Sequence, residues 1–219
     1  MTDRTTASGS SKASWFSSTP DRQPMLMRLL LPSLLFPTVL WMALLLALTA
    51  CEPNPATDSP AQHPRLDVSG IDTMQTRIVI EKSKYRLHLY EGDSLLRSYP
   101  VVLGGDPVTD KHQEGDSRTP EGLFHVRTKY DHAKWSKFIW VDYPTEESYR
   151  RFEARKAAGK IAQDASIGGE IGIHGVPEGR DDLIRNGQNW TLGCISLTRA
   201  DVDELYALIR TGTEIRILH

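Results

Sequence analysis

The chain has 219 residues, a formal net charge of −2 and a pI near 6.4. This length accommodates one ordinary domain plus a tail, and the nearly balanced charge gives no electrostatic reason to expect a nucleic-acid partner. The only two cysteines, Cys51 and Cys194, lie in unlike sequence contexts, which excludes a disulfide framework as the basis of the fold.

The N-terminal region has the organisation of an exported protein. Residues 1–24 are polar and rich in Ser and Thr, which predicts a disordered extension. Residues 25–50 contain Arg28, then an apolar stretch that ends in small residues before Cys51, and this order is typical of a secretory signal. Because about 20 apolar residues can also cross a bilayer, an uncleaved membrane anchor is the alternative. In either case the remainder is expected to be exported and tethered to a membrane.

The end of this segment resembles the bacterial lipobox, in which cleavage precedes a cysteine whose sulfur receives a diacylglycerol. The resemblance implies that Cys51 is a lipid anchor and that the protein faces the periplasm. Glu52 favours the outer over the inner membrane. Residues 51–73 are expected to form an extended, semi-stiff linker because of their prolines, which are Pro53, Pro55, Pro60 and Pro64.

Residues 74–219 are predicted to form one mainly β domain with one or two helices. Apolar and polar residues alternate in several short runs, as in half-buried strands, and Tyr85 is expected to face the core with Leu87 and Leu89. A polar loop spans 110–122. The predicted strands are 77–81, 84–90, 95–103, 123–127, 138–141 and 214–218.

Two segments of this domain carry helix signals. One helix is expected to begin at Thr145, with acidic residues in its first turn and basic residues in its last, the order that the helix dipole favours. Tyr149 and Phe152 are expected to contact the body of the domain. The second helix is expected to begin at Thr198, with Asp201 positioned for a capping box and an apolar face behind it.

Two reactive side chains late in the chain each end a short apolar run and adjoin a glycine: His174 precedes Gly175, and Cys194 follows Gly193. Alone, each could be a packing residue, since free cysteines are often buried. Together they predict a nucleophile and its base, because an imidazole lowers the pKa of a neighbouring thiol. The backbone N–H groups of Gly193, Cys194 and Gly175 are expected to stabilise an oxyanion. A backbone carbonyl near Gly175 is expected to orient the imidazole.

Zinc is the rival use of a cysteine and a histidine. A structural zinc site needs four ligands and a catalytic one three, and the other candidates, His125 and His132, have unfavourable spacing. We therefore expect no metal and no cofactor.

The pair His174-Gly175, followed by Thr191-Leu-Gly193-Cys194-Ile195, resembles the signature of the L,D-transpeptidase (YkuD-type) catalytic domain. The same run from Trp190 and the segment Gly115–Gly122, which contains Thr119-Pro120-Glu121-Gly122, are also similar to the family pattern. These separated matches occur in the family's order and cover about residues 75–218.

The resemblance implies a β-sandwich-like catalytic fold and a cysteine acyltransferase that acts on peptidoglycan stem peptides. Cys194 would attack the carbonyl of a diaminopimelate and expel D-alanine, with His174 taking the thiol proton. An amine of another stem, or of a protein that becomes attached to the wall, would resolve the thioester. Carbapenems would be expected to acylate the same thiol.

One residue departs from the family pattern. The signature has an arginine two residues after the cysteine, where this chain has Ser196, and a hydroxyl cannot hold a carboxylate bidentately. Arg118 or Arg180 could take over that function. The candidate substrate-binding residues are therefore Thr191, Ser196, Arg118 and Trp190.

Two alternatives remain open at the sequence level. The same Cys-His site could use water as the acceptor, which would make the protein an L,D-carboxypeptidase or amidase. In a different class, the protein could be a non-catalytic, lipid-anchored wall-binding module in which Cys194 serves packing.

Overall fold

The computed structural model describes residues 64–219. By its internal contacts the chain divides after Asn54, and the described residues all belong to the second unit, Pro55–His219. The predicted extension, signal segment, lipidated Cys51 and first part of the linker lie outside the described residues. Within residues 64–219, no helix is both long and apolar enough to cross a bilayer.

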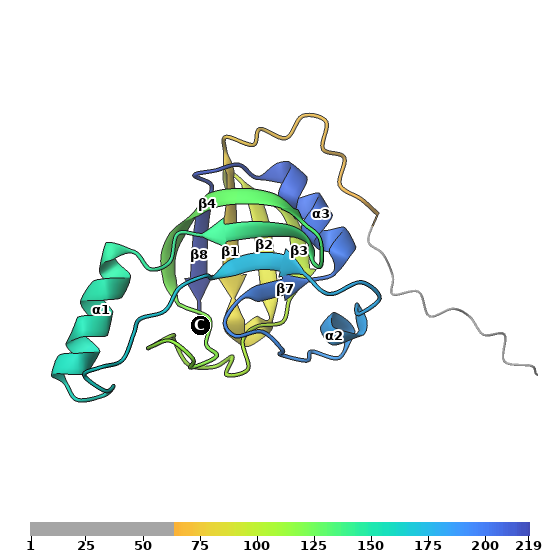
Figure 1. Cartoon of the computed structure of the whole chain (residues 1–219). Helices are drawn as coiled ribbons and strands as arrows, with labels where there is room; N and C mark the ends of the chain where they lie inside the picture. Colours follow the sequence, from red (N-terminus) through yellow and green to blue (C-terminus); the bar gives the residue numbers. More distant parts are fainter. Residues whose placement is uncertain (1–63) are drawn as a thin grey trace, which may run out of the picture. The chain divides into compact units, whose positions relative to one another are not determined.

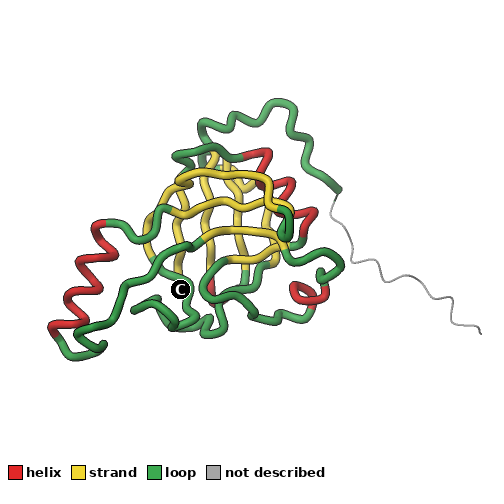
Figure 2. Tube along the Cα trace, in the orientation of Figure 1, coloured by secondary structure: helices red, strands yellow, loops and turns green. Residues whose placement is uncertain are grey.

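The described residues form one curled sheet of eight strands (Figures 1 and 2). The strands are β1 (Thr76–Glu81), β2 (Arg86–Glu91), β3 (Ser94–Pro100), β4 (Gly122–His132), β5 (Ser136–Val141), β6 (Gly172–Gly175), β7 (Ile195–Leu197) and β8 (Glu214–Leu218). Their order in the sheet is β3-β2-β1-β8-β4-β5-β6-β7. An antiparallel bridge between Val102 and Ser196 joins the segment after β3 to β7. The mainly β fold is confirmed, as a barrel-like sheet.

The sheet bends at strand β4. Its first residues, from Gly122 to His125, pair with β8, whereas Val126 and the residues after it pair with β5. It is longer than the predicted strand 123–127, because it continues as one arm of a β4–β5 hairpin. This hairpin leads into the second half of the sheet, β6 and β7, which returns to the first half through the bridge between Ser196 and Val102.

The predicted core positions of β1 and β2 are confirmed, with Leu87 and Leu89 fully buried on the inner face. Tyr85 also packs against the core, as predicted, but it is only partly buried and does not belong to the strand. Tyr85 ends a short 3-10 turn, η1 (Lys82–Lys84), with a left-handed φ of 53°, and its N–H donates to the Lys82 carbonyl. The turn therefore displaces it from the strand, which begins one residue later.

Both predicted helices form, as α1 (Glu146–Ala157) and α3 (Arg199–Leu208), and one further short helix, α2 (Asp182–Arg185), was not predicted. The hydroxyls of Thr145 and Thr198 accept from the N–H groups of Ser148 and Asp201, as N-caps do. Phe152 is buried, but Tyr149 is 50% exposed, so that part of the prediction is wrong. The reason is that α1 lies beside the sheet (Figure 1) and docks mainly through arginines onto the polar loop.

The end of the expected linker contacts the domain. The Pro64 carbonyl accepts from Arg97, the Leu66 N–H donates to Glu204, and Leu66 and Ile71 pack against the core. The expected boundary at Met74 thus falls within a segment that already touches the folded unit.

A buried lysine holds the polar loop between β3 and β4. Lys82 is 1% exposed, and its ammonium donates to the carbonyls of Thr109 and Thr119 at 2.9 and 3.1 Å and to the Glu121 carboxylate at 2.9 Å. A buried charge is tolerated only when it is paired and hydrogen-bonded in this way. Lys82 therefore fixes two points of the loop against the sheet.

Replacing Lys82 by Met should lower the free energy of unfolding by about 2–4 kcal/mol, because the half-buried Glu121 carboxylate and two carbonyls lose their donor. Urea unfolding measures this change. Lys84→Met is the matched control, since that side chain is 66% exposed and pairs only with Glu81, and it should change stability little. Equal losses in the two variants would contradict the assignment.

Candidate active site

The pairing of β6 with its neighbours places the two predicted reactive residues on one face. His174 lies opposite Phe138 of β5 and opposite Ser196 of β7, which runs parallel to β6. The adjacent Ile173 and Ile195 are fully buried in the core. Because side chains alternate along a strand, His174 and Ser196 point to the other face, and Cys194, two residues before Ser196, follows them.

The imidazole of His174 is 2% exposed and held by its own strand. Nδ1 lies 2.8 Å from the carbonyl oxygen of Gly175. A carbonyl can only accept, so Nδ1 carries the proton and donates, and Nε2 is left as an acceptor. Burial lowers the pKa of His174 to about 4, an effect that outweighs the bond to Gly175. At neutral pH the ring is therefore a neutral base.

Three aromatic rings account for this burial. Trp135 stacks on His174 with ring centroids 4.3 Å apart and planes 23° apart. Phe138 lies parallel to the imidazole at 5.7 Å, and Trp190 meets it edge-on at 5.6 Å. Sequence reasoning singled out only Trp190. Trp135 and Phe138 could have been found only from the register of the β4–β5 hairpin, which places them beside β6.

The Cys194 thiol is half-buried beside the start of β6. Its Sγ donates to the Glu170 carbonyl at 3.5 Å and accepts a hydrogen bond from the Gly172 backbone. Gly172 precedes His174 by two residues, so the sulfur lies about one strand repeat, roughly 6–7 Å along β6, from the histidine backbone. The Cys194 sulfur, carried by the loop before β7, therefore lies against the start of β6, two residues from His174 along that strand.

The pKa of Cys194 is raised to about 11, mainly by burial and to a smaller extent by the Glu170 carboxylate, against the lowering effects of the Gly172 N–H and the Lys111 ammonium. The expectation that the imidazole lowers the pKa of this thiol is therefore wrong for the resting structure. Because a neutral, buried imidazole offers no positive charge to a thiolate, the resting pair is a thiol and a neutral base.

The loop before the thiol is fixed by two threonines. The Thr191 hydroxyl donates to the Cys194 carbonyl at 2.6 Å and accepts from the Gly193 N–H at 3.2 Å. The fully buried Thr119 donates to the Gly193 carbonyl at 2.9 Å. Gly193 has φ +138°, and a Cβ there would lie 2.7 Å from the Arg118 carbonyl oxygen. Only glycine permits this approach.

These contacts correct the expected oxyanion donors. The Gly193 N–H is taken by Thr191, and the Gly175 N–H donates to the Trp135 carbonyl at 3.0 Å. Both glycines are required for close packing, since a Cβ at Gly175 would lie 2.6 Å from that Trp135 oxygen. Of the three expected donors, the Cys194 N–H is the one that remains for an oxyanion.

The expected substrate-binding residues have different surroundings. Ser196 is fully buried, and its Oγ has no hydrogen-bond partner among residues 64–219; Trp190 Nε1 shares this property. Arg118 lies beside Gly193 through its carbonyl, but its Nε donates to Asp106 at 2.7 Å. Arg180 is on the surface, paired with Asp182 at 2.9 Å.

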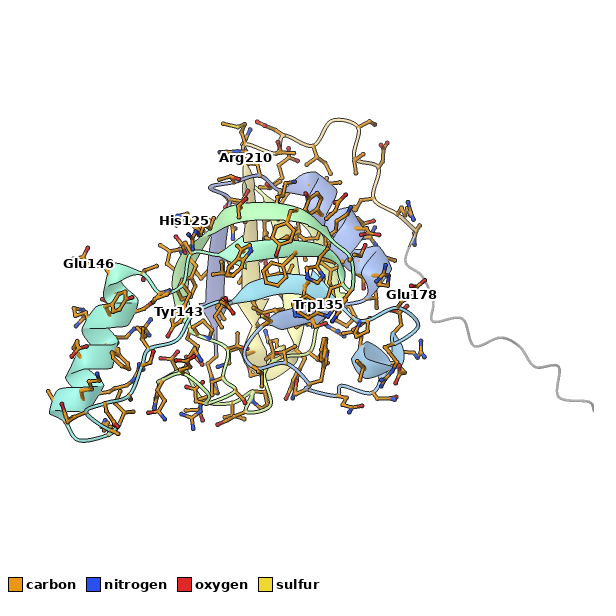
Figure 3. The ribbon with its side chains drawn as sticks, viewed as in Figure 1. His125, Trp135, Tyr143, Glu146, Glu178 and Arg210 are labelled. Carbon is orange, nitrogen blue, oxygen red and sulfur yellow. The ribbon has the colours of Figure 1, made fainter. Side chains whose placement is uncertain are left out.

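The two histidines considered as zinc ligands lie apart. His125 is near Asp142 at one end of the β4–β5 hairpin, whereas His132 lies at the other end beside Trp135, and Figure 3 shows His125 and Trp135 at these opposite ends. In the described part of the chain, no group of three or more His, Cys, Asp or Glu residues could hold a metal ion.

The fold and this site define a mainly β domain that presents a thiol and a neutral imidazole on one face of a strand pair. The family model of the L,D-transpeptidase catalytic domain, YkuD, matches residues 75–217. The chain therefore belongs to the L,D-transpeptidase catalytic domain family, as the resemblance of its motifs predicted.

Solved structures with a similar arrangement are remote in sequence. They include Bd1075 of Bdellovibrio bacteriovorus, with 17% identity, coverage of 70% of this chain and 50% of that one, and a TM-score of 0.46. The helical cell shape determining protein Pgp2 of Campylobacter jejuni has 19% identity, coverage of 65% and 46%, and a TM-score of 0.44. L,D-transpeptidase 1 of Mycobacterium tuberculosis has 14% identity, coverage of 66% and 62%, and a TM-score of 0.41. This chain spans about half the length of the first two. No curated protein matches it.

Alkylation of Cys194 by iodoacetamide should accelerate about tenfold per pH unit from about pH 7 to about pH 10, because the thiolate fraction grows until the pH reaches the pKa of about 11. The modified Cys194 peptide is quantified by mass spectrometry in the full-length protein, which separates it from Cys51. A rate that is already constant above about pH 7 would contradict a protonated resting thiol.

The buried His174 should make the protein less stable in acid. Its pKa is about 4 in the folded state, against 6.5 for a histidine free in water, so the unfolded chain binds the proton more tightly between these values. Stability is then full above about pH 6.5 and falls as the pH drops toward 4, by about 3 kcal/mol for this group alone.

Urea unfolding of the wild type and of His174→Gln at about pH 7 and about pH 4 measures this contribution. Both proteins share every other acid-labile group, so the variant should lose less stability than the wild type over this interval. Identical losses would contradict the low pKa of His174.

Proposed function

We propose that this protein is a peptidoglycan L,D-transpeptidase in which Cys194 is the nucleophile and His174 the general base. The observation that supports the proposal most strongly is that the Cys194 thiol is hydrogen-bonded to Gly172 of β6, two residues from His174, whose Nδ1 is bonded to Gly175 so that Nε2 is unprotonated, in a chain of this family. The substrate class is the peptidoglycan stem peptide, and the reaction needs no cofactor.

In the acylation step, the sulfur of Cys194 forms a bond to the carbonyl carbon of the third stem residue while its proton moves to Nε2 of His174. The Cys194 N–H stabilises the oxygen that becomes negative. The C–N bond to D-alanine then breaks, and the leaving amine takes the proton from His174. Since the resting pair is neutral, the proton leaves the sulfur as the new bond forms rather than before.

In the second step, an amine attacks the thioester and gives its proton to His174, and the thiol is regenerated. An amine of another stem gives a crosslink, and an amine of a protein attaches that protein to the wall. Water in the same place gives carboxypeptidase activity instead. The acceptor is therefore decided by which nucleophile reaches the thioester first.

Substrate contacts follow from the surroundings of the pair. Trp190 Nε1 is a polar atom without a protein partner among the described residues, in a half-buried ring close to His174, and is proposed to hydrogen-bond the stem peptide. Ser196 is fully buried, so it is proposed to act only through its neighbours. Thr191 acts by holding the thiol loop. Arg118 contributes its backbone at Gly193, because its guanidinium is engaged by Asp106.

The location of the protein is also a proposal. The lipobox-like segment supports an exported lipoprotein, anchored through Cys51 and facing the periplasm, with the outer membrane favoured. An anchored enzyme of this kind would work on the wall within reach of its linker.

A meropenem-type carbapenem should acylate the full-length protein once, and intact mass spectrometry should show the adduct. Cys194→Ala should abolish it, and His174→Gln should slow it by at least about a hundredfold, within the usual range for loss of a general base. Cys51→Ala is the matched control, because it removes the other thiol and should leave the adduct unchanged.

Incubation with tetrapeptide muropeptides then identifies the reaction. Crosslinked dimers and released D-alanine indicate transpeptidation, whereas tripeptides alone indicate hydrolysis. A folded wild type that gives neither adduct nor product would overturn the enzymatic proposal in favour of a wall-binding module.

A further inference from the structure

The tip of the β4–β5 hairpin lies against His174. Residues 133–135 form the turn between β4 and β5, and Ser136, the first residue of β5, has a left-handed φ of 62°. This geometry brings Trp135 back over β6, and Figure 3 shows Trp135 at that end of the hairpin. The indole then stacks on the imidazole of His174, with centroids 4.3 Å apart.

Further contacts hold Trp135 in place. Its ring also stacks on His132, at 4.4 Å and 10°. The Nδ1 of His132 accepts from the N–H groups of Lys134 and Trp135, both at 3.2 Å, so His132 ties the turn together. The Trp135 carbonyl accepts from Gly175 at 3.0 Å. Ring and backbone of Trp135 thus both contact the His174-Gly175 pair.

The tip is also fastened to α3. The Arg199 guanidinium donates to the Lys134 carbonyl at 3.1 Å, and the Ser136 hydroxyl donates to Asp203 at 2.5 Å. Helix α3 follows β7 through its N-cap Thr198. The segment that carries Cys194 therefore continues directly into α3, and α3 in turn is hydrogen-bonded to the hairpin tip that carries Trp135.

We propose that Trp135 is a positioning residue, which fixes the plane of the His174 ring and keeps water from the face that it covers. The catalytic consequence of this positioning rests on the proposed function, whereas the stacking of Trp135 on His174 does not. The indole limits rotation of the imidazole, so that Nε2 stays directed at the site while Nδ1 remains bonded to Gly175. A base held in this way needs no reorganisation when the thiol proton is transferred.

The charged and titratable groups around the ring support this role. Cys194 precedes β7 on the same face, and His132 lies against the indole at the end of β4. Asp203 and Arg199 of α3 are bonded to the hairpin tip. Among the described residues no carboxylate bonds to His174, so desolvation by the surrounding rings is the main effect on its pKa.

The test compares Trp135→Ala with Trp135→Phe. Loss of the indole should raise the pKa of His174 from about 4 toward 6.5, slow carbapenem acylation by about tenfold or more, and move the acid limb of the acylation pH profile upward by the same interval. Phe should restore most of the pKa and the rate. The pKa is measured by NMR titration of the imidazole in the full-length protein.

Trp140→Ala is the matched control, since it removes an indole from the same strand pair that contacts Phe138, at 5.1 Å, rather than His174. It should leave the His174 titration unchanged. If Trp135→Ala does not fold, Trp135→Leu, which keeps bulk but not stacking, gives the same comparison.

An unchanged His174 titration in a folded Trp135 variant, or an equal shift in Trp140→Ala, would overturn the inference. The NMR readout does not depend on catalysis. If the Trp135 variants shift the pKa of His174 but neither they nor the wild type are acylated, the proposed function is refuted. The positioning of His174 by Trp135 would still stand.

Discussion

The parallel pairing of β6 with β7 is the constraint on which the site depends. These are the shortest strands of the sheet, and they are joined by the long segment 176–194. A slip of one residue would turn His174 toward the core and Ile173 outward, because side chains alternate in direction. The burial of Ile173 and Ile195 prevents this slip. The hydrophobic core therefore decides on which face the imidazole and the thiol meet, although neither belongs to it.

Burial then sets the protonation of the pair. Desolvation penalises the charged form of each group, so it raises the pKa of the thiol and lowers that of the imidazole. A preformed thiolate-imidazolium pair would need both shifts to be reversed. The same water-poor surroundings strengthen any hydrogen bond to charge that develops during the reaction. A protonated thiol also reacts slowly with oxidants, which protects a half-buried cysteine.

Local signals in the sequence were sufficient for most elements but not for the surroundings of the base. Alternation predicted the strands with one buried face, and the threonine caps predicted α1 and α3. The extension of β4 beyond residue 127 was missed because its outer half is largely exposed and polar, and its turn has no glycine. Without that hairpin, the neighbours of His174 could not be inferred: Trp135 is distant from it in sequence and meets it only through strand register. The occupied N–H groups of Gly193 and Gly175 were likewise invisible, since they depend on partners from other segments.

The two reactive groups are held by different kinds of interaction. His174 is fixed by stacked rings and one carbonyl, which a hydrophobic face can supply. The thiol loop is fixed by polar contacts that begin at Lys82, pass through the Thr119 carbonyl and hydroxyl, and end at the Gly193 carbonyl. Such a buried network is stable only when every member is satisfied. Cys194 therefore depends on a lysine far from it in sequence, and the loop that forms this link also presses the Arg118 carbonyl against Gly193. A larger residue at position 193 would break the geometry of the nucleophile while leaving the stacking around the base intact.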